Sequence, residues 1–380
     1  MFKFLRSLHF IGGVLVPFFL DWGQISFTQI MLLQSFFVLS IFFLEIPTGA
    51  VADYLGRKAS LILAAFVGII APIVYTLQPN IYIFLLGEFL WALGFALCSG
   101  ADEALVYDSL KKTKSEKKSK KIFARFNSSE LVALMIGSPV GSIIASTFGL
   151  RYAMMFMAVP SVFAFFVALS LHEPKVVRKV NSRNYFGTLL GGVKYFKEHR
   201  VLKILAFDRV SITALAFMVI WMYQPLLKQL AVPLVFFGFV HAAMTGIQVP
   251  FLNNFGRLER LFGSKKRYLL WSAVIAGVSF VLLGVNSYVP ITILLILLIS
   301  GFGLSRDVLF QSYMNKYIES HNRATVLSTV SMIDRFFRAV LYPLMGLLVE
   351  WSLNYTLVAV GVAIVLFALM SGVKEEHLVD

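Results

Sequence analysis

The chain has 380 residues, of which 58% are hydrophobic and only 14% charged, and its mean hydropathy is +0.80. A soluble domain of this size needs a more polar surface, so the composition excludes the soluble classes and indicates a membrane protein. The formal net charge of +14 would also suit a nucleic-acid-binding protein, but the arrangement of the basic residues, described below, argues against that function. Cys98 is the single cysteine, which excludes disulfides and cysteine-based metal sites.

Twelve apolar runs are long enough to cross a bilayer as helices. In chain order they lie near residues 4–20, 27–50, 59–78, 81–106, 122–148, 152–171, 201–227, 233–254, 268–287, 289–314, 324–349 and 352–373. The first run has no cleavage site and leads directly into the second, so we expect a retained helix and not a signal peptide. The predicted fold class is an all-α integral membrane protein with twelve transmembrane helices.

The basic residues crowd every second loop, while the opposite loops contain only Arg151 and Lys228. This asymmetry predicts a multi-pass protein of the cytoplasmic (inner) membrane with both termini in the cytoplasm. The lysine-rich segment 111–121 is interpreted as a topogenic loop beside anionic lipid, and not as an RNA-binding patch. No nucleic-acid partner is expected.

One long polar interval, residues 172–200, separates six predicted spans from six. Residues 184–200 within it have the apolar spacing of an amphipathic helix lying in the membrane interface. We therefore expect an N-terminal bundle over 1–171, a cytoplasmic linker over 172–200 and a C-terminal bundle over 201–380. Residues 49–58 and 256–265 place a Gly, a charged residue, a Gly and a Lys at the same offsets, which indicates a degenerate internal repeat.

Charge is unevenly distributed among the predicted spans. The third, sixth, ninth and twelfth spans contain no Asp, Glu, Lys or Arg in their interiors. Ionisable groups within a bilayer are costly unless they face protein or a wet cavity. Every third helix is therefore expected to face lipid, and the others to surround something polar. The charged residues in those other spans are Glu45, Glu88, Asp102, Glu103, Glu130, Asp208, Arg209, Arg306, Asp307, Asp334, Arg335 and Arg338.

The loop G-A-V-A-D-Y-L-G-R-K at 49–58 resembles the signature G-x-x-x-D-x-x-G-R-K that major facilitator superfamily transporters carry between spans two and three. Twelve spans, two halves and a long central loop extend the resemblance over the whole chain. Segments 99–110 and 323–328 are similar to a bacterial subgroup of efflux-type or unassigned transporters. The resemblance implies two pseudo-symmetric six-helix bundles and transport by alternating access.

Two departures from the family bear on its mechanism. Glu88 lies early in span four, where many proton-coupled members carry an Arg. In span five, A-L-M-I-G-S-P-V-G-S at 133–142 keeps Gly137, Pro139 and Gly141 of the antiporter pattern, with the proline shifted by one position. This shift weakens an assignment to drug antiport.

The resemblance implies a cytoplasmic latch in which the loop aspartate contacts the start of span eleven. The two glycines are expected to allow close backbone approach, and the carboxylate to be attracted by a helix N-terminus. The alternative is that the basic residues of the loop only set topology. The latch residues are Gly49, Asp53, Gly56, Arg57, Lys58 and Arg323.

Two carboxyl groups are candidates for proton coupling. Glu88 shares a helix face with Ser99, and Glu45 shares one with Gln34, a candidate cavity residue. A carboxyl that can be protonated within the membrane is what proton coupling requires. For Glu45, Asp102 and Glu103 the favoured alternative is a structural charge network near the cytoplasmic face, which is expected to comprise Asp102, Glu103, Arg125 and Glu130.

In the second half, Asp334 and Arg338 are four residues apart, and Arg306 and Asp307 lie in span ten. Internal neutralisation is the simpler interpretation, because an unpaired buried charge is costly. The guanidinium groups of Arg306, Arg335 and Arg338 outnumber Asp307 and Asp334, however, so one is also a candidate for binding an anionic substrate group. His241, in span eight, is either a hydrogen-bonded interior residue or a proton relay.

We expect a monomeric secondary transporter, driven by a proton gradient, that exports an amphipathic or organic-ion compound. Uptake of an anionic metabolite by symport is the alternative within the same fold, and a lipid translocase or a non-transporting sensor is the alternative of another class. The sequence contains no H-E-x-x-H, G-x-S-x-G or Walker motif. Neither an enzymatic activity nor a cofactor is therefore expected, and the partners are a small solute, protons and membrane lipids.

Overall fold

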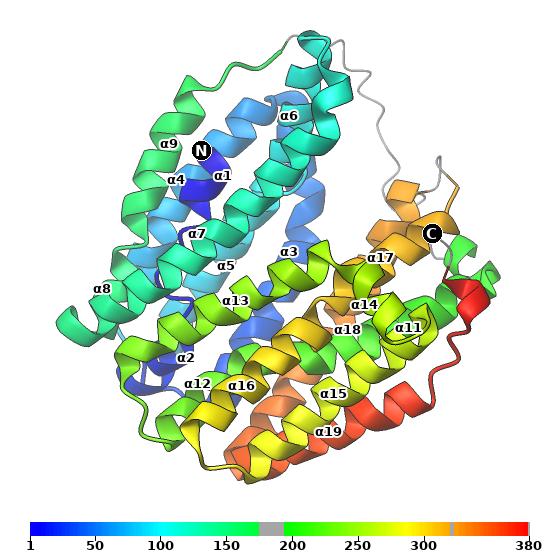
Figure 1. Ribbon diagram of the computed structural model, residues 1–380. Helices are drawn as coiled ribbons and strands as arrows, with labels where there is room; N and C mark the ends of the chain where they lie inside the picture. Colours follow the sequence, from blue (N-terminus) through cyan, green and yellow to red (C-terminus); the bar gives the residue numbers. More distant parts are fainter. Residues whose placement is uncertain (175–193, 320–322, 379–380) are drawn as a thin grey trace. The chain divides into compact units, whose positions relative to one another are not determined.

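The computed structural model describes residues 1–174, 194–319 and 323–378, and this part of the chain is helical, with no strands. Its residues fall into two compact units (Figure 1). The first unit comprises residues 1–182 with 233–242, and the second comprises residues 183–232 with 243–380. The predicted amphipathic helix over 184–200 lies largely outside the described residues.

Up to residue 174 the helices belong to the first unit. They are α1 (Phe2–Arg6), α2 (Leu15–Pro17), η1 (Phe18–Trp22), α3 (Phe27–Tyr54), α4 (Arg57–Tyr75), α5 (Ile81–Cys98), α6 (Ala101–Lys112), η2 (Glu116–Lys118), α7 (Ser119–Phe148), α8 (Leu150–Met155) and α9 (Ala158–Ser170).

From residue 200 onward the helices belong to the second unit, except that residues 233–242, which include η3 and the first turns of α13, group with the first. They are α11 (Arg200–Phe217), α12 (Val219–Gln229), η3 (Leu234–Phe236), α13 (Phe237–Asn253), α14 (Phe255–Leu261), α15 (Lys265–Val285), α16 (Val289–Leu298), η4 (Ile299–Leu304), α17 (Arg306–Lys316), α18 (Arg323–Trp351), α19 (Leu353–Leu369) and η5 (Glu375–His377).

Nine helical segments of the described chain are long and apolar enough to cross a membrane. They are Phe27–Tyr54, Arg57–Tyr75, Ile81–Lys112, Lys121–Phe148, Leu150–Ser170, Arg200–Gln229, Leu234–Asn253, Lys265–Val285 and Val289–Lys316. Two further predicted spans correspond to α19, a 17-residue apolar helix, and to α18, a 29-residue helix that contains Asp334, Arg335 and Arg338. An all-α membrane fold is therefore confirmed.

The first predicted span, residues 4–20, is not a continuous helix, and this expectation was wrong. Its helical hydrogen bonding stops after α1 and resumes only at α2. The intervening backbone lies against α7, where a Cβ added at Gly141 would overlap the Phe10 carbonyl oxygen and one at Gly137 would come within 2.9 Å of the His9 nitrogen. Glycines at i and i+4 let two backbones approach this closely, so tertiary packing interrupts the helix.

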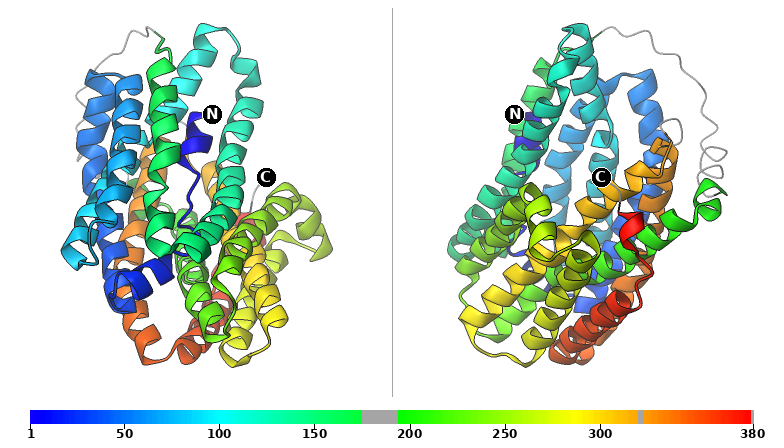
Figure 2. Two further views of the ribbon diagram at one scale, coloured as in Figure 1. Left: turned by 90° about the vertical axis from the view of Figure 1, so that its left-hand side faces the viewer. Right: turned by 45° about the vertical axis from the view of Figure 1, so that its right-hand side comes forward.

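Within each unit the packing of the predicted lipid-facing spans is the same. Helix α4 packs against α9 in the first unit, and α15 packs against α19 in the second, where the two run side by side (Figures 1 and 2). All four helices expose large apolar side chains, such as Phe66, Phe163, Trp271 and Leu366. A helix in contact with lipid requires such a surface.

Candidate functional site

The first unit contains a buried carboxyl group whose contacts are neutral. Glu88 on α5 is 4% exposed, and its Oε1 accepts a hydrogen bond of 2.9 Å from Nε2 of Gln34 on α3. The Tyr75 hydroxyl on α4 also hydrogen-bonds Glu88. Tyr75 in turn packs against the rings of Phe18 and Phe84. The two groups that hydrogen-bond Glu88 are therefore uncharged, and one of them lies in an aromatic cluster.

The contact between Gln34 and Glu88 differs from the sequence-based grouping, which placed Gln34 with Glu45 and Glu88 with Ser99. Glu45 is half-buried on α3, and Ser99 is an exposed residue at the end of α5. Shared helical spacing places Gln34 and Glu45 on one face of α3, and Gln34 is buried there. The spacing does not reveal which residue of a neighbouring helix Gln34 meets, because that depends on how the two helices are rotated against each other.

The predicted charge network near α6 is only partly assembled. Glu130 on α7 pairs with Lys3 at 3.1 Å, and Lys3 also donates a 2.9 Å hydrogen bond to Asn127. Asp102 accepts a hydrogen bond from the backbone of Glu103. Both Glu103 and Arg125 have exposed side chains. The cation that pairs with Glu130 is therefore Lys3 of the N-terminal helix α1. In the sequence, the two basic residues within the first six positions were the indication that this helix could supply it.

The loop after α3 owes its shape to Gly56 and to an acid that follows the sixth span. Gly56 has φ +105°, in the region that favours glycine. The Glu173 carboxylate accepts hydrogen bonds from the backbone nitrogens of Arg57, at 2.8 Å, and Lys58, at 3.1 Å. It therefore caps the first turn of α4, where unpaired N–H groups and the helix dipole favour an anion.

The other residues of this loop have different environments. The Arg57 guanidinium forms an ion pair with Asp108 on α6 and a hydrogen bond to the Ala104 carbonyl oxygen. Asp53 is exposed at the end of α3. A Cβ at Gly49 would meet no atom within 4 Å, so the close approach expected at Gly49 is absent from this part of the described structure. The partner assigned to Asp53, Arg323, begins α18, and its side chain lies outside the described residues.

The equivalent loop of the second unit repeats the same arrangement. Gly263 has φ +86°, and the Glu375 carboxylate accepts hydrogen bonds from the backbone nitrogens of Lys265, at 3.0 Å, and Lys266, at 2.8 Å. Glu375 follows α19 as Glu173 follows α9. Gly256, like Gly49, has no atom near its added Cβ. The repeat seen in the two loops thus extends to the acids that cap the following helices.

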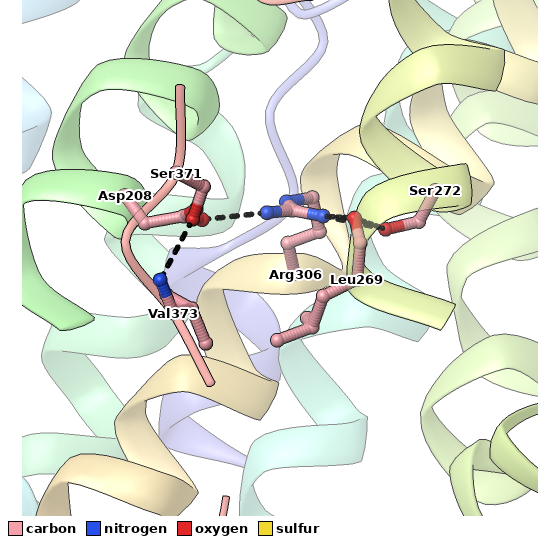
Figure 3. A network of polar contacts seen from close by, with 6 residues as sticks. All are labelled: Asp208, Leu269, Ser272, Arg306, Ser371 and Val373. Carbon is pink, nitrogen blue, oxygen red and sulfur yellow. Dashed lines mark hydrogen bonds and ion pairs between the residues drawn. The ribbon is translucent and has the colours of Figure 1, made fainter. Parts of the chain in front are cut away.

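Two ion pairs connect α11 and α17 in the second unit, and each helix contributes an Asp and an Arg at adjacent positions. Asp208 pairs with Arg306 at 2.7 Å, and Arg209 pairs with Asp307 at 2.9 Å. Arg306 is 1% exposed, and it also contacts the Leu269 carbonyl oxygen and the Ser272 hydroxyl (Figure 3). The Asp307 side chain, in contrast, is 37% exposed. One pair is therefore buried, while the acid of the other is partly exposed.

The remaining candidates named for the second half have the following contacts. Asp334 and Arg338 form the expected pair one helical turn apart on α18, at 3.0 Å. Arg335 is half-buried and interacts with other residues. Adding Asp208 and Arg209 to the count of charged residues adds one acid and one base, so the arginines still outnumber the aspartates by one. His241 lies in the first unit, where its Nδ1 is 2.8 Å from the Ser138 hydroxyl of α7.

The comparisons with known proteins agree with this architecture. A family model described as Major Facilitator Superfamily matches residues 5–252. The structure of the nucleoside transporter NupG is similar with a TM-score of 0.77 at 15% identity, covering 97% of this chain and 96% of that one. A bacterial homolog to the human lysosomal transporter Spinster, in an inward-facing and unoccupied conformation, has a TM-score of 0.78 at 13% identity, covering 99% and 95%.

A D-xylose-proton symporter is also similar, with a TM-score of 0.70 at 16% identity, covering 98% of this chain and 95% of that chain. The search of the curated proteins finds no match. At identities this low, the structural likeness shows the fold, and the substrates named for these proteins belong to them alone.

Proposed function

Since the family match extends over residues 5–252, the chain belongs to the Major Facilitator Superfamily, and we propose that it is a proton-coupled secondary transporter of a small organic solute. Transport as the general role follows from the family. The proposal adds alternating access by two six-helix halves, with the proton gradient as the energy source. Export of an amphipathic or organic-ion compound is the first expectation for its direction and substrate.

The proposal of proton coupling rests on the buried carboxyl group of Glu88 and its uncharged hydrogen-bond partners. Its contacts with Gln34 and Tyr75 can satisfy either protonation state, since the amide donates to a carboxylate oxygen and the phenol can donate or accept. Neither contact neutralises a negative charge, and an uncompensated carboxylate in such surroundings is costly. A proton removes that cost, so the arrangement favours uptake of a proton when the group is enclosed and its release when water reaches it.

For the solute, we propose a site that includes the Arg209–Asp307 pair. The pair is hydrogen-bonded through both carboxylate oxygens, at 2.9 and 3.2 Å, yet the Asp307 side chain is 37% exposed. A charged group on a solute can compete for one member of such a pair. This supports an organic ion as the substrate, and it applies to import of an anionic metabolite as well as to export.

The experiment reconstitutes the purified chain in liposomes that enclose a pH-sensitive dye. A panel of nucleosides, pentoses, short peptides and organic cations and anions is added under pH gradients of both directions. We expect one solute class to move protons with it, and the sign of the pH change relative to solute flux distinguishes antiport from symport. If labelled lipid crosses the bilayer while no solute moves under any gradient, the proposal of a solute transporter fails and the protein is a lipid translocase.

Three variants test the assignment of the proton to Glu88. Glu88→Gln should abolish gradient-driven flux while leaving downhill solute exchange, because Gln keeps the hydrogen bonds and cannot titrate. Glu45→Gln tests the other candidate carboxyl. Glu116→Gln, in an exposed segment of the first unit, is the matched control and should behave as the native chain does. Gradient-driven flux that survives in Glu88→Gln and fails in Glu45→Gln would transfer the role to Glu45.

A further inference from the structure

Two adjoining cavities lie at one end of the second unit, between α11, α15 and α19. The first, of about 230 Å³, is lined by Lys266 and Arg306, and the second, of about 200 Å³, by Lys203. Asp208 and Ser371 line both cavities, so the two share a polar wall. Arg306 was a candidate for substrate binding from the sequence, but the solute site proposed above is the Arg209–Asp307 pair, and neither of its members lines these cavities.

The cavities contain more positive than negative charge. Asp208 is already matched, because its Oδ1 lies 2.7 Å from Arg306 and its Oδ2 accepts a 2.5 Å hydrogen bond from the Ser371 hydroxyl (Figure 3). The ammonium groups of Lys203 and Lys266 have no ion-pair partner among the described residues. Glu375 contacts Lys266 through its backbone nitrogen and not through its ammonium group. Two cations beside a neutralised pair attract an anion.

Arg306 provides a second, independent indication of a ligand. Its side chain is 1% exposed and lines the first cavity. Within the described part of the chain, its Nε is a buried donor with no hydrogen-bond acceptor. A buried donor that lacks an acceptor is costly, and a charged one more so. An anionic oxygen in the cavity would supply the missing acceptor.

The position of the cavities indicates the kind of anion. Lys203 lies in the first turn of α11, Lys266 is the second residue of α15, and Ser371 follows the end of α19. These helix ends are at the level of lipid headgroups when the helices cross a bilayer. The neighbouring surface is apolar, with Phe207 63% exposed and Leu369 65% exposed. The ligand is therefore expected to combine an anionic head with an apolar tail.

We propose that this region binds an anionic phospholipid, with its phosphate between Lys203 and Lys266 and an acyl chain along Phe207 and Leu369. Inorganic phosphate shares the charge of the headgroup, but it cannot use the apolar surface beside the cavities. Phosphatidylcholine has the acyl chains without the net negative charge. The proposed ligand needs both features at once.

The test uses the full chain, purified in a neutral detergent and stripped of lipid. Phosphatidylglycerol, phosphatidylcholine and inorganic phosphate are titrated separately, with thermal unfolding and native mass spectrometry as readouts. Phosphatidylglycerol should raise the melting temperature saturably, because a ligand of the native state stabilises it, and should be retained as a one-to-one adduct. The other two should do neither in the same concentration range.

The double substitution Lys203→Gln with Lys266→Gln should weaken phosphatidylglycerol binding about 25-fold, at about fivefold for each lysine near a headgroup. Both lysines are exposed, so the variant is expected to fold. Arg257→Gln with Lys316→Gln, at two exposed residues of the second unit that line neither cavity, removes the same charge elsewhere and should bind as the native chain does. The proposal is overturned if both double variants bind equally, if phosphatidylcholine binds as tightly, or if inorganic phosphate saturates the same site.

Discussion

Glu173 and Glu375 hold equivalent positions in the two units, each closing the first turn of the helix that follows a glycine of positive φ. Each carboxylate accepts hydrogen bonds from two successive backbone nitrogens, of Arg57 and Lys58 in one unit and of Lys265 and Lys266 in the other. The two loops share little sequence beyond their glycines and one lysine. Their common geometry therefore reflects the shared requirement to satisfy a helix N-terminus at the end of a tight turn.

The glycines of the first loop give a matched pair of substitutions. Gly56→Ala should destabilise the chain by about 1–2 kcal/mol, because φ +105° disfavours any side chain and its Cβ would lie 2.6 Å from Glu173. Gly49→Ala should instead be neutral or stabilise by up to about 1 kcal/mol, since Gly49 is inside α3 with open space around it. Thermal unfolding in detergent measures both. Equal losses in the two variants would contradict the structural distinction between them.

The Glu375 cap predicts a dependence of stability on pH. Partial burial acts to raise the pKa of Glu375, but hydrogen bonds from the Lys266 backbone, the Ser264 hydroxyl and the Lys265 backbone, with the Lys265 charge, outweigh it and lower the pKa below its ordinary value of 4.5. A carboxylate with a lowered pKa stabilises the fold above its ordinary pKa, and this contribution is lost as the pH falls through the lowered value.

Glu375→Gln should therefore have a lower melting temperature than the native chain at pH 7, and the difference between them should shrink as the pH is lowered below about 4.5. Glu376→Gln is the control, because its side chain is exposed and caps no helix of the described chain. A difference that is constant between pH 7 and pH 4 would exclude a titrating cap.

The sequence predicts contacts between residues that are close together along the chain better than contacts between distant residues. The pairing of Asp334 with Arg338 follows from their separation of one helical turn, and the structure confirms it. Most of the spans, the two glycine loops and the resemblance to the family were likewise recognised from short segments of sequence. Glu173 and Glu375 were detectable too, as acids that directly follow the sixth and twelfth spans, but their partners lie more than 100 positions away.

Relationships between helices were not predictable in the same way. The contacts of Glu88 with Gln34 and of Asp208 with Arg306 depend on the rotation and depth of one helix against another, which spacing along a single helix leaves undetermined. The interrupted first span has the same origin. Its sequence is apolar enough for a helix, and the backbone departs from one where the glycines of α7 allow it to pack closely.

The proposed latch is tested by Asp53→Asn. If the Asp53 charge holds the halves closed at the cytoplasmic side, its removal should favour inward-facing states by about two- to fivefold, the effect of one charge at a helix terminus. The reporter is a single cysteine at Thr48, which is 4% exposed, in a chain whose buried Cys98 is replaced by alanine. Labelling by a membrane-impermeant maleimide should become faster. Glu116→Gln is the control, and an unchanged labelling rate in Asp53→Asn would remove the latch.

The Asp208–Arg306 and Arg209–Asp307 pairs should contribute very differently to the free energy of unfolding, although each joins an Asp and an Arg of the same two helices. Asp208→Asn leaves the fully buried Arg306 without its counter-charge and should cost about 3–5 kcal/mol of unfolding free energy. Asp307→Asn affects a pair whose acid is 37% exposed, and solvent screening should limit the cost to about 1 kcal/mol.

Adding Arg306→Gln to Asp208→Asn should recover much of the loss, because the double variant buries two neutral groups that can hydrogen-bond to each other. Denaturant unfolding of the four chains in detergent completes the double-mutant cycle for Asp208 and Arg306. The expected coupling energy is above about 1 kcal/mol, the range seen for residues in one hydrogen-bonded network. Additive losses, or equal costs for Asp208→Asn and Asp307→Asn, would show that enclosure of the Asp208–Arg306 pair does not determine its contribution.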